Sequence, residues 1–183
     1  IIYCILLLAA MLSGFLDDKS DKPWSELKKG LIDMAISVMT AITFVNFQPD
    51  KVGFTFFHEF IEINPIIYII LAAILIFVSI NVTNCSDGVD GLCGTLVAVT
   101  LVTIYFRLPD NNYSLITLLI VASILGYLWF NTSPSRLLMG DAGSRALGFF
   151  IGMLVLKTFN PLIYIPVAFV LIIDGGLGLV KLT

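Results

Sequence analysis

Three clusters of carboxylates stand out in a chain that is otherwise largely apolar. They are Asp17 with Asp18, Asp87 with Asp90, and Asp141 after a glycine. Each cluster lies at the end of an apolar stretch, where an ionised side chain is costly to place unless its charge is used. Neighbouring carboxylates also repel each other unless a cation or a basic partner relieves the repulsion. The clusters therefore predict a cation-dependent site if the fold brings them together.

The residues around the second and third clusters favour binding of an anionic ligand. Asn84, Asp87 and Asp90 supply oxygens and amides, and Gly88 allows close approach to the backbone. Asp87 and Asp90 would share one face if their segment is helical; a simple polar turn is the alternative. Asp141 fits an N-cap or first-turn position, and a helix N-terminus can also bind phosphate through its free N–H groups.

Oxygen is the main metal-binding donor near these clusters. The sole histidine, His58, falls on the opposite side of the predicted membrane from them, and Cys4, Cys85 and Cys93 have no paired ligand spacing. A zinc site and a disulfide framework are therefore not predicted. Oxygen donors beside a phosphate-bearing substrate favour Mg²⁺ that retains several waters.

The composition is that of an integral membrane protein. Of 183 residues 58% are hydrophobic and 13% charged, and the mean hydropathy is +1.01. Apolar runs long enough for a membrane predict an all-α fold, a polytopic transmembrane helical bundle with about seven spans near 1–16, 31–46, 64–80, 92–107, 114–130, 143–159 and 162–180. Residues 1–183 are expected to form a single integral membrane domain, incomplete at both ends, in contact with membrane lipids and with no nucleic-acid partner.

The basic residues predict the orientation. With alternating spans, one side receives Lys19, Lys22, Lys28, Lys29, Arg136, Arg145 and Lys181, and the other receives Lys51, Arg107 and Lys157. An excess of Lys and Arg marks the cytoplasmic side, and that side also receives all three acidic clusters. The loop 47–63, on the other side, alternates in a way that predicts a short hairpin. Gly148 and Gly152 have the GxxxG spacing of helix packing.

The order and spacing of these motifs resemble the polyprenyl-phosphate N-acetylhexosamine-1-phosphate transferase superfamily, and most of all its bacterial branch that transfers phospho-MurNAc-pentapeptide. The matching segments are Ser13–Asp18, Asn84–Leu92, Phe130–Pro134 and Met139–Ser144. The resemblance implies a ten-helix homodimer of the bacterial plasma membrane with a cytoplasmic active site. It would transfer phospho-MurNAc-pentapeptide from UDP-MurNAc-pentapeptide to undecaprenyl phosphate, release UMP and so form the first lipid-linked peptidoglycan precursor.

The resemblance also implies roles for single residues. Asp141 would be the Mg²⁺ ligand, Asp17 the general base, and Asp18 a support for the phosphate or metal. Lys29, with Lys28 as the alternative, would lie near the diphosphate. The nucleotide pocket would be lined by Asn84, Asp87, Gly88, Asp90, Asn131 and Leu138. The family usually has Phe where Leu138 stands, so stacking on uracil from this position is lost, and Cys85 and Arg145 occupy positions that are commonly Leu.

Two alternatives stay open. A transferase of the same superfamily that uses UDP-GlcNAc would carry the same motifs, and the His-rich cytoplasmic loop that distinguishes the two branches lies beyond the last span seen here. An ion-coupled transporter is the alternative from another class. Its carboxylates would lie near the membrane midplane in broken helices, whereas here they are predicted at span ends on one side.

Overall fold

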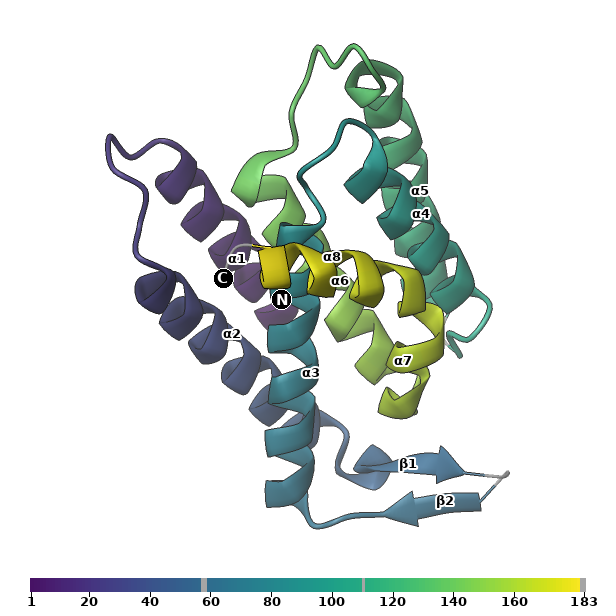
Figure 1. Cartoon of the computed structure of the whole chain (residues 1–183). Helices are drawn as coiled ribbons and strands as arrows, with labels where there is room; N and C mark the ends of the chain where they lie inside the picture. Colours follow the sequence, from purple (N-terminus) through teal and green to yellow (C-terminus); the bar gives the residue numbers. More distant parts are fainter. Residues whose placement is uncertain (57–58, 110, 182–183) are drawn as a thin grey trace.

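The computed structural model describes residues 1–56, 59–109 and 111–181, so His58 lies outside the described residues. The fold is mostly helical (Figure 1). Its elements are α1 (Ile2–Asp18), α2 (Glu26–Phe47), η1 (Pro49–Lys51), β1 (Gly53–Phe56), β2 (Glu59–Glu62), α3 (Pro65–Cys85), α4 (Leu92–Tyr105), α5 (Asn111–Asn131), α6 (Gly140–Lys157), η2 (Pro161–Ile163), α7 (Tyr164–Val167) and α8 (Phe169–Lys181).

Local sequence explains where several helices begin. The Ser25 hydroxyl accepts a hydrogen bond from the Lys28 N–H at the start of α2. Asn64 does the same for Ile66 before α3, whose first residue is proline. Gly91 precedes α4 with φ +76°, a conformation that glycine adopts without strain. These caps satisfy N–H groups that have no partner inside their own helix.

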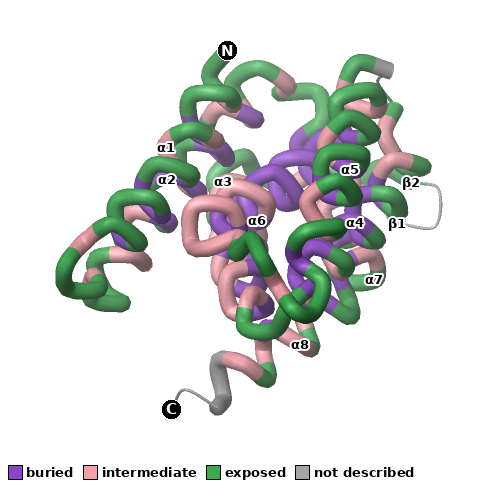
Figure 2. Tube along the Cα trace, turned by 90° about the horizontal axis from the view of Figure 1, so that it is seen from above, coloured by how far each residue is buried: buried purple, intermediate pink, exposed green. Residues whose placement is uncertain are grey.

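Helix α6 lies at the centre of the bundle and packs mainly on α1 and α3. Residues 148–157 are buried, and a Cβ at Gly148 would lie 2.6 Å from the carbonyl oxygen of Ser79. The Ser79 hydroxyl donates to the Gly148 carbonyl oxygen at 2.7 Å. The helix-packing prediction for Gly148 and Gly152 is thus confirmed. Buried positions gather where the helices face one another, and the outer faces of α1, α2 and α5 are exposed (Figure 2).

Fewer helices qualify as membrane spans by length and composition than the seven predicted. In the described part of the chain three do, Glu26–Phe47, Pro65–Cys85 and Asn112–Asn131, and a fourth if the bent pair Pro161–Val167 and Phe169–Gly178 is one span. Helices α1, with 17 residues, and α4, with 14, match predicted spans but are shorter than the helices that qualify, and α6 carries Asp141, Arg145 and Lys157. The count of seven stays a prediction.

The segment of the predicted span near 162–180 is broken into two helices, and whether the pair forms one span stays a prediction. The chain bends by 74° between α7 and α8, and the α7 helix ends where the Ala168 N–H bonds to the Tyr164 carbonyl. Pro166 removes one helix hydrogen bond beside the bend and its ring crowds the preceding turn. Helix α8 then packs on α3, because Gly175 carries no Cβ that would collide with the Val82 backbone.

The loops lie at the two ends of the bundle as the alternating spans predicted, while the cytoplasmic orientation drawn from the basic residues stays a prediction. The loops after α1, α3 and α5 lie at one end, and the predicted hairpin, an antiparallel β1–β2 pair with Phe54 opposite Ile61, lies at the other (Figure 1). All three acidic clusters are therefore at one end. Arg145 belongs to the interior rather than to a loop, since only 1% of its surface is exposed, and it does not bear on the orientation.

Candidate active site

The end of α1 meets the beginning of α6. A Cβ at Gly14 would lie 2.6 Å from the Ala142 nitrogen, so the absence of a side chain allows this approach. The Asp18 carboxylate accepts hydrogen bonds from the N–H groups of Asp141 and Ala142, both at 3.3 Å. Of the two positions predicted for Asp141, N-cap or first turn, the structure shows the first turn of α6. The carboxylate that caps α6 is that of Asp18. A negative group here is stabilised by the helix dipole.

Asp17 is buried beside a lysine. Its Oδ2 lies 2.7 Å from Lys29 Nζ, and its Oδ1 accepts a hydrogen bond from the Trp24 N–H at 2.7 Å. Burial alone would raise the pKa of Asp17, but the hydrogen bonds from Lys29 and Trp24 and the Lys29 charge outweigh it and hold this pKa below its ordinary value. Asp17, which lies beyond the predicted span 1–16, is therefore ionised at neutral pH. Lys28 instead stacks over the Trp24 ring at 3.3 Å.

Lys29 also reaches the third cluster, because its Nζ lies 3.6 Å from Asp141 Oδ2. Burial raises the pKa of Asp141, and repulsion from Asp18 and Asp17 adds to the increase while Lys29 reduces it. Within the described residues the Asp141 Oδ2 atom is buried and has no hydrogen-bond partner. An oxygen of this kind is what a bound cation would satisfy.

The donor set fits Mg²⁺ better than a metal held by protein groups alone. Across residues 1–56, 59–109 and 111–181 no group of three or more His, Cys, Asp or Glu side chains is arranged to hold a metal ion. Mg²⁺ is commonly held by one or two carboxylates, with water and substrate phosphates as its other ligands. Asp141 would be that carboxylate, with Asp18 beside it.

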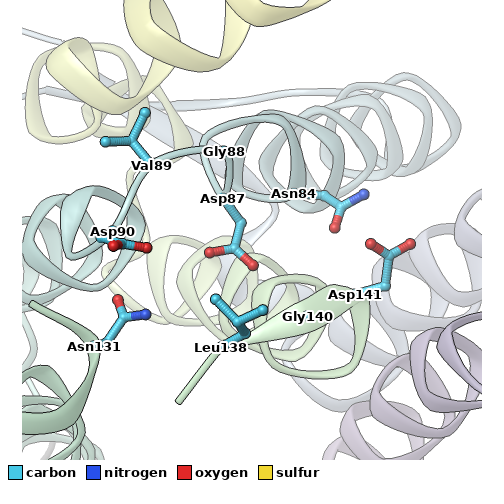
Figure 3. Close-up of a pocket in the computed structure, with 9 residues that line it drawn as sticks. All are labelled: Asn84, Asp87, Gly88, Val89, Asp90, Asn131, Leu138, Gly140 and Asp141. Atoms are coloured by element: carbon cyan, nitrogen blue, oxygen red, sulfur yellow. The ribbon is translucent and has the colours of Figure 1, made fainter. Parts of the chain in front are cut away.

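A polar cavity of about 240 Å³ opens next to Asp141 (Figure 3). Burial raises the pKa of Asp87, and the charges of Asp141 and Asp18 add to this although the Gly140 N–H lowers it. The cavity thus concentrates negative charge that a cation would offset. Its lining consists of Asn84, Asp87, Gly88, Val89, Asp90, Asn131, Leu138, Gly140 and Asp141.

The predicted substrate-binding residues come together here, with the exception of Lys29, which contacts Asp141 but does not line the cavity. Asp87 and Asp90 do not share a helix face, because residues 86–91 form turns and not a helix, which was the alternative prediction. They reach the same cavity because the turn wraps around it. Val89 and Gly140 also line the cavity and were not predicted.

Asn131 shapes this cavity. It is 4% exposed; its Oδ1 accepts from the Gly91 N–H at 2.9 Å and its Nδ2 donates to the Leu137 carbonyl at 2.8 Å. Asp90 adds a second link by accepting a hydrogen bond from the Ser135 N–H at 3.2 Å. The polar atoms of Asn131 therefore hold the two loops together, and its predicted contact with a nucleotide stays a prediction.

Sequence reasoning missed a buried ion pair next to the site. Arg145 on α6 donates a hydrogen bond to Asp33 on α2. A signal was available, because Asp33 follows Lys29 by four residues and Arg145 follows Asp141 by four, which places each pair on one helix face. It was not used because neither residue belongs to a recognised motif.

Comparison with known proteins agrees with the motifs. The profile of glycosyl transferase family 4 matches residues 1–159. The chain is 39% identical over 201 residues to the phospho-N-acetylmuramoyl-pentapeptide-transferase of Treponema pallidum (strain Nichols), covering 97% of this chain and 55% of that protein. It is 32% identical over 166 residues to the protein of the same name from Thermotoga neapolitana, covering 85% of this chain and 53% of that protein. The chain spans about half the length of these curated relatives.

Proposed function

The chain belongs to glycosyl transferase family 4, and from this premise we propose that the complete protein is a phospho-MurNAc-pentapeptide transferase. It moves phospho-MurNAc-pentapeptide from a UDP-linked donor to undecaprenyl phosphate and releases UMP. The names of its relatives favour this donor over UDP-GlcNAc. The position of the carboxylates favours an enzyme over a transporter, because they lie at helix ends and in loops at one end of the bundle (Figure 1).

One observation carries the proposal most strongly. Lys29 lies between the buried Asp17 and Asp141, whose Oδ2 atom has no hydrogen-bond partner among the described residues, and Asp141 in turn lines a polar cavity. A base, a cation site and a nucleotide-sized hollow are the parts that a reaction between two phosphate-bearing substrates requires. A purely structural cluster would be expected to satisfy all of its buried oxygens.

The residues can be assigned to steps of a single displacement. An oxygen of the lipid phosphate attacks the phosphorus attached to the sugar; a new P–O bond forms while the bond to the bridging oxygen breaks, and UMP leaves with that electron pair. Asp17 accepts a proton if the lipid phosphate still carries one, and Lys29 attracts the anionic substrates. Mg²⁺ held at Asp141 would neutralise charge on the diphosphate. A two-step route through an aspartyl-phosphate is the alternative.

We further propose that α1, α4 and α6 cross the membrane along with the apolar helices, as part of a ten-helix, homodimeric protein of the bacterial plasma membrane. Large apolar side chains on the outside of α1, such as Leu8 and Leu12, are half exposed, as is favourable against lipid. Residues 1–183 would then be one membrane domain of a longer chain. The acidic end, which also carries Lys19, Lys22 and Arg136, would face the cytoplasm.

UMP release by the full-length protein tests the proposal. The protein is incubated with undecaprenyl phosphate and Mg²⁺, and UDP-MurNAc-pentapeptide and UDP-GlcNAc are offered in parallel. We expect UMP from the pentapeptide donor alone, and a loss on the order of a hundredfold or more in Asp141→Asn, since a group that stabilises transition-state charge is removed. Release only from UDP-GlcNAc would move the protein to the sister branch. No release from either donor would refute the transferase function for these substrates.

A further inference from the structure

The buried ion pair of Asp33 and Arg145 is not used by the mechanism above. Their side chains are 3% and 1% exposed, and the Arg145 guanidinium donates to the Asp33 carboxylate. Among the described residues the Arg145 Nε atom is buried and has no hydrogen-bond partner. Replacing such a pair by apolar residues is often neutral or stabilising. Stability alone is therefore a weak reason for a pair whose donors are incompletely satisfied.

The pair continues the arrangement of the active site into the bundle. On α2, Asp33 follows Lys29 by one helical turn, and on α6, Arg145 follows Asp141 by one turn. Lys29 faces Asp141 at 3.6 Å, and Asp33 faces Arg145. The four side chains form a charge ladder of two ion pairs, in which the sign alternates along each helix and between the helices. Lys29–Asp141 is the outer rung and Asp33–Arg145 is the inner rung.

The ladder joins two helices that otherwise hardly touch. Helix α2 packs mainly on α3 and has few direct contacts with α6, which packs on α1 and α3. Close packing therefore acts on the rotation of α2 relative to α6 mainly through α1 and α3, on which both helices pack. The hydrogen bond from the Arg145 guanidinium to Asp33 Oδ1 joins α2 directly to α6, so the inner rung adds a direct constraint on this rotation.

We propose that Asp33 and Arg145 are positioning residues that hold Lys29 in register with Asp141 and so shape the cation site. Lys29 must stay close enough to Asp141 to reduce repulsion among the carboxylates, yet far enough from the Asp141 Oδ2 atom to leave it open to the divalent ion. Without the inner rung, α2 can rotate and move the Lys29 ammonium group toward or away from that oxygen. The assignment of a cation to Asp141 rests on the proposed function.

Variants of the full-length protein separate positioning from support of the fold. Asp33→Leu/Arg145→Met removes the pair without leaving a buried unpaired charge. Asp33→Arg/Arg145→Asp keeps the pair but places like charges one turn apart on each helix, next to Lys29 and Asp141. Lys157→Met is the matched control, because Lys157 is a 5% exposed cation on the same helix that binds Gln48 at the opposite end.

The primary readout is Mn²⁺ binding without substrates, measured by electron paramagnetic resonance, together with the thermal unfolding midpoint. We expect both double variants to fold. In Asp33→Leu/Arg145→Met, Mn²⁺ binding should be weakened at least about fivefold and kcat should fall by a larger factor than the KM for the donor rises, whereas the charge exchange, which keeps the pair, should weaken Mn²⁺ binding less. Lys157→Met should lower the unfolding midpoint and leave Mn²⁺ binding unchanged. Asp33→Leu/Arg145→Met protein that folds and binds Mn²⁺ like the wild type would overturn the proposal, as would wild-type protein that binds none.

The same measurements distinguish failure of the positioning role from failure of the proposed transferase function. If the wild-type protein binds Mn²⁺ but releases no UMP from either donor, the transferase function fails while the variants still test the positioning. If UMP is released normally by both double variants at every Mg²⁺ concentration, the positioning role fails while the transferase function stands.

Discussion

Gly14 offers a direct test of how tightly the active site depends on helix packing. We expect Gly14→Ala to push the first turn of α6 away from α1, because the added Cβ would lie 2.6 Å from the Ala142 nitrogen and closer still to the Asp141 carbonyl group. The atoms in its way are backbone, so no side chain can move aside. Asp141 is the residue displaced, and Asp18 would lose its good geometry with the Asp141 and Ala142 N–H groups.

The expected size follows from the distances. Cβ atoms are essentially never found within 3.0 Å of another heavy atom, so the nitrogen must retreat by at least 0.4 Å, and the carbonyl by more. Overpacking of this kind costs about 1–3 kcal/mol of stability. A displacement approaching 1 Å at reacting groups lowers the rate by up to about a hundredfold. We therefore expect UMP release to fall about ten- to a hundredfold while the protein still folds.

The assay is UMP release together with thermal unfolding of the full-length protein in detergent. Gly30→Ala is the matched control, because in the described part of the chain nothing lies within 4 Å of a Cβ built at Gly30, which is also in a helix near the same end. It should be neutral or slightly stabilising. Gly14→Ala protein with wild-type kcat and wild-type stability would refute the idea that α1 sets the position of Asp141. An equal loss in both variants would show that the effect is unspecific.

Three further predictions concern the pocket and its acid. Leu138→Phe should lower the KM for the UDP-linked donor about two- to tenfold, as an aromatic ring at this 77% exposed cavity position can stack on the base; an unchanged KM would place the uracil elsewhere. Gly88→Ala should raise that KM without changing the unfolding midpoint, since nothing described lies within 4 Å of its added Cβ; a lowered midpoint would point to a structural role. The pKa of Asp17 is lower in the folded protein than its ordinary value of about 4, so ionised Asp17 stabilises the fold above that value, and this contribution is lost as pH falls through the folded pKa. Unfolding midpoints measured from pH 7 to pH 3 should therefore fall more in the wild type than in Asp17→Asn. Parallel curves would contradict the assigned partners Lys29 and Trp24.

Much of the fold follows from local sequence. Long apolar runs interrupted by polar turns predicted the position of every long helix to within a few residues, and alternation in the loop 47–63 predicted the hairpin. These features depend on neighbours in the chain, since a helix in an apolar setting satisfies its own backbone groups. The bend between α7 and α8 was not predicted, and it involves Pro166, whose effect depends on whether α3 offers a surface for the helix that follows.

The sequence by itself determined the chemistry of this protein, that is, which carboxylates, amides and glycines are available and at which end of the bundle they gather. Only the tertiary structure decided how they are used. Asp18 caps α6 from a position 123 residues away, Lys29 and not Lys28 faces Asp141, and Arg145 pairs with Asp33 across the bundle. Each of these outcomes depends on the rotation of one helix against another, and that rotation is set by contacts between distant segments, which local sequence patterns do not encode.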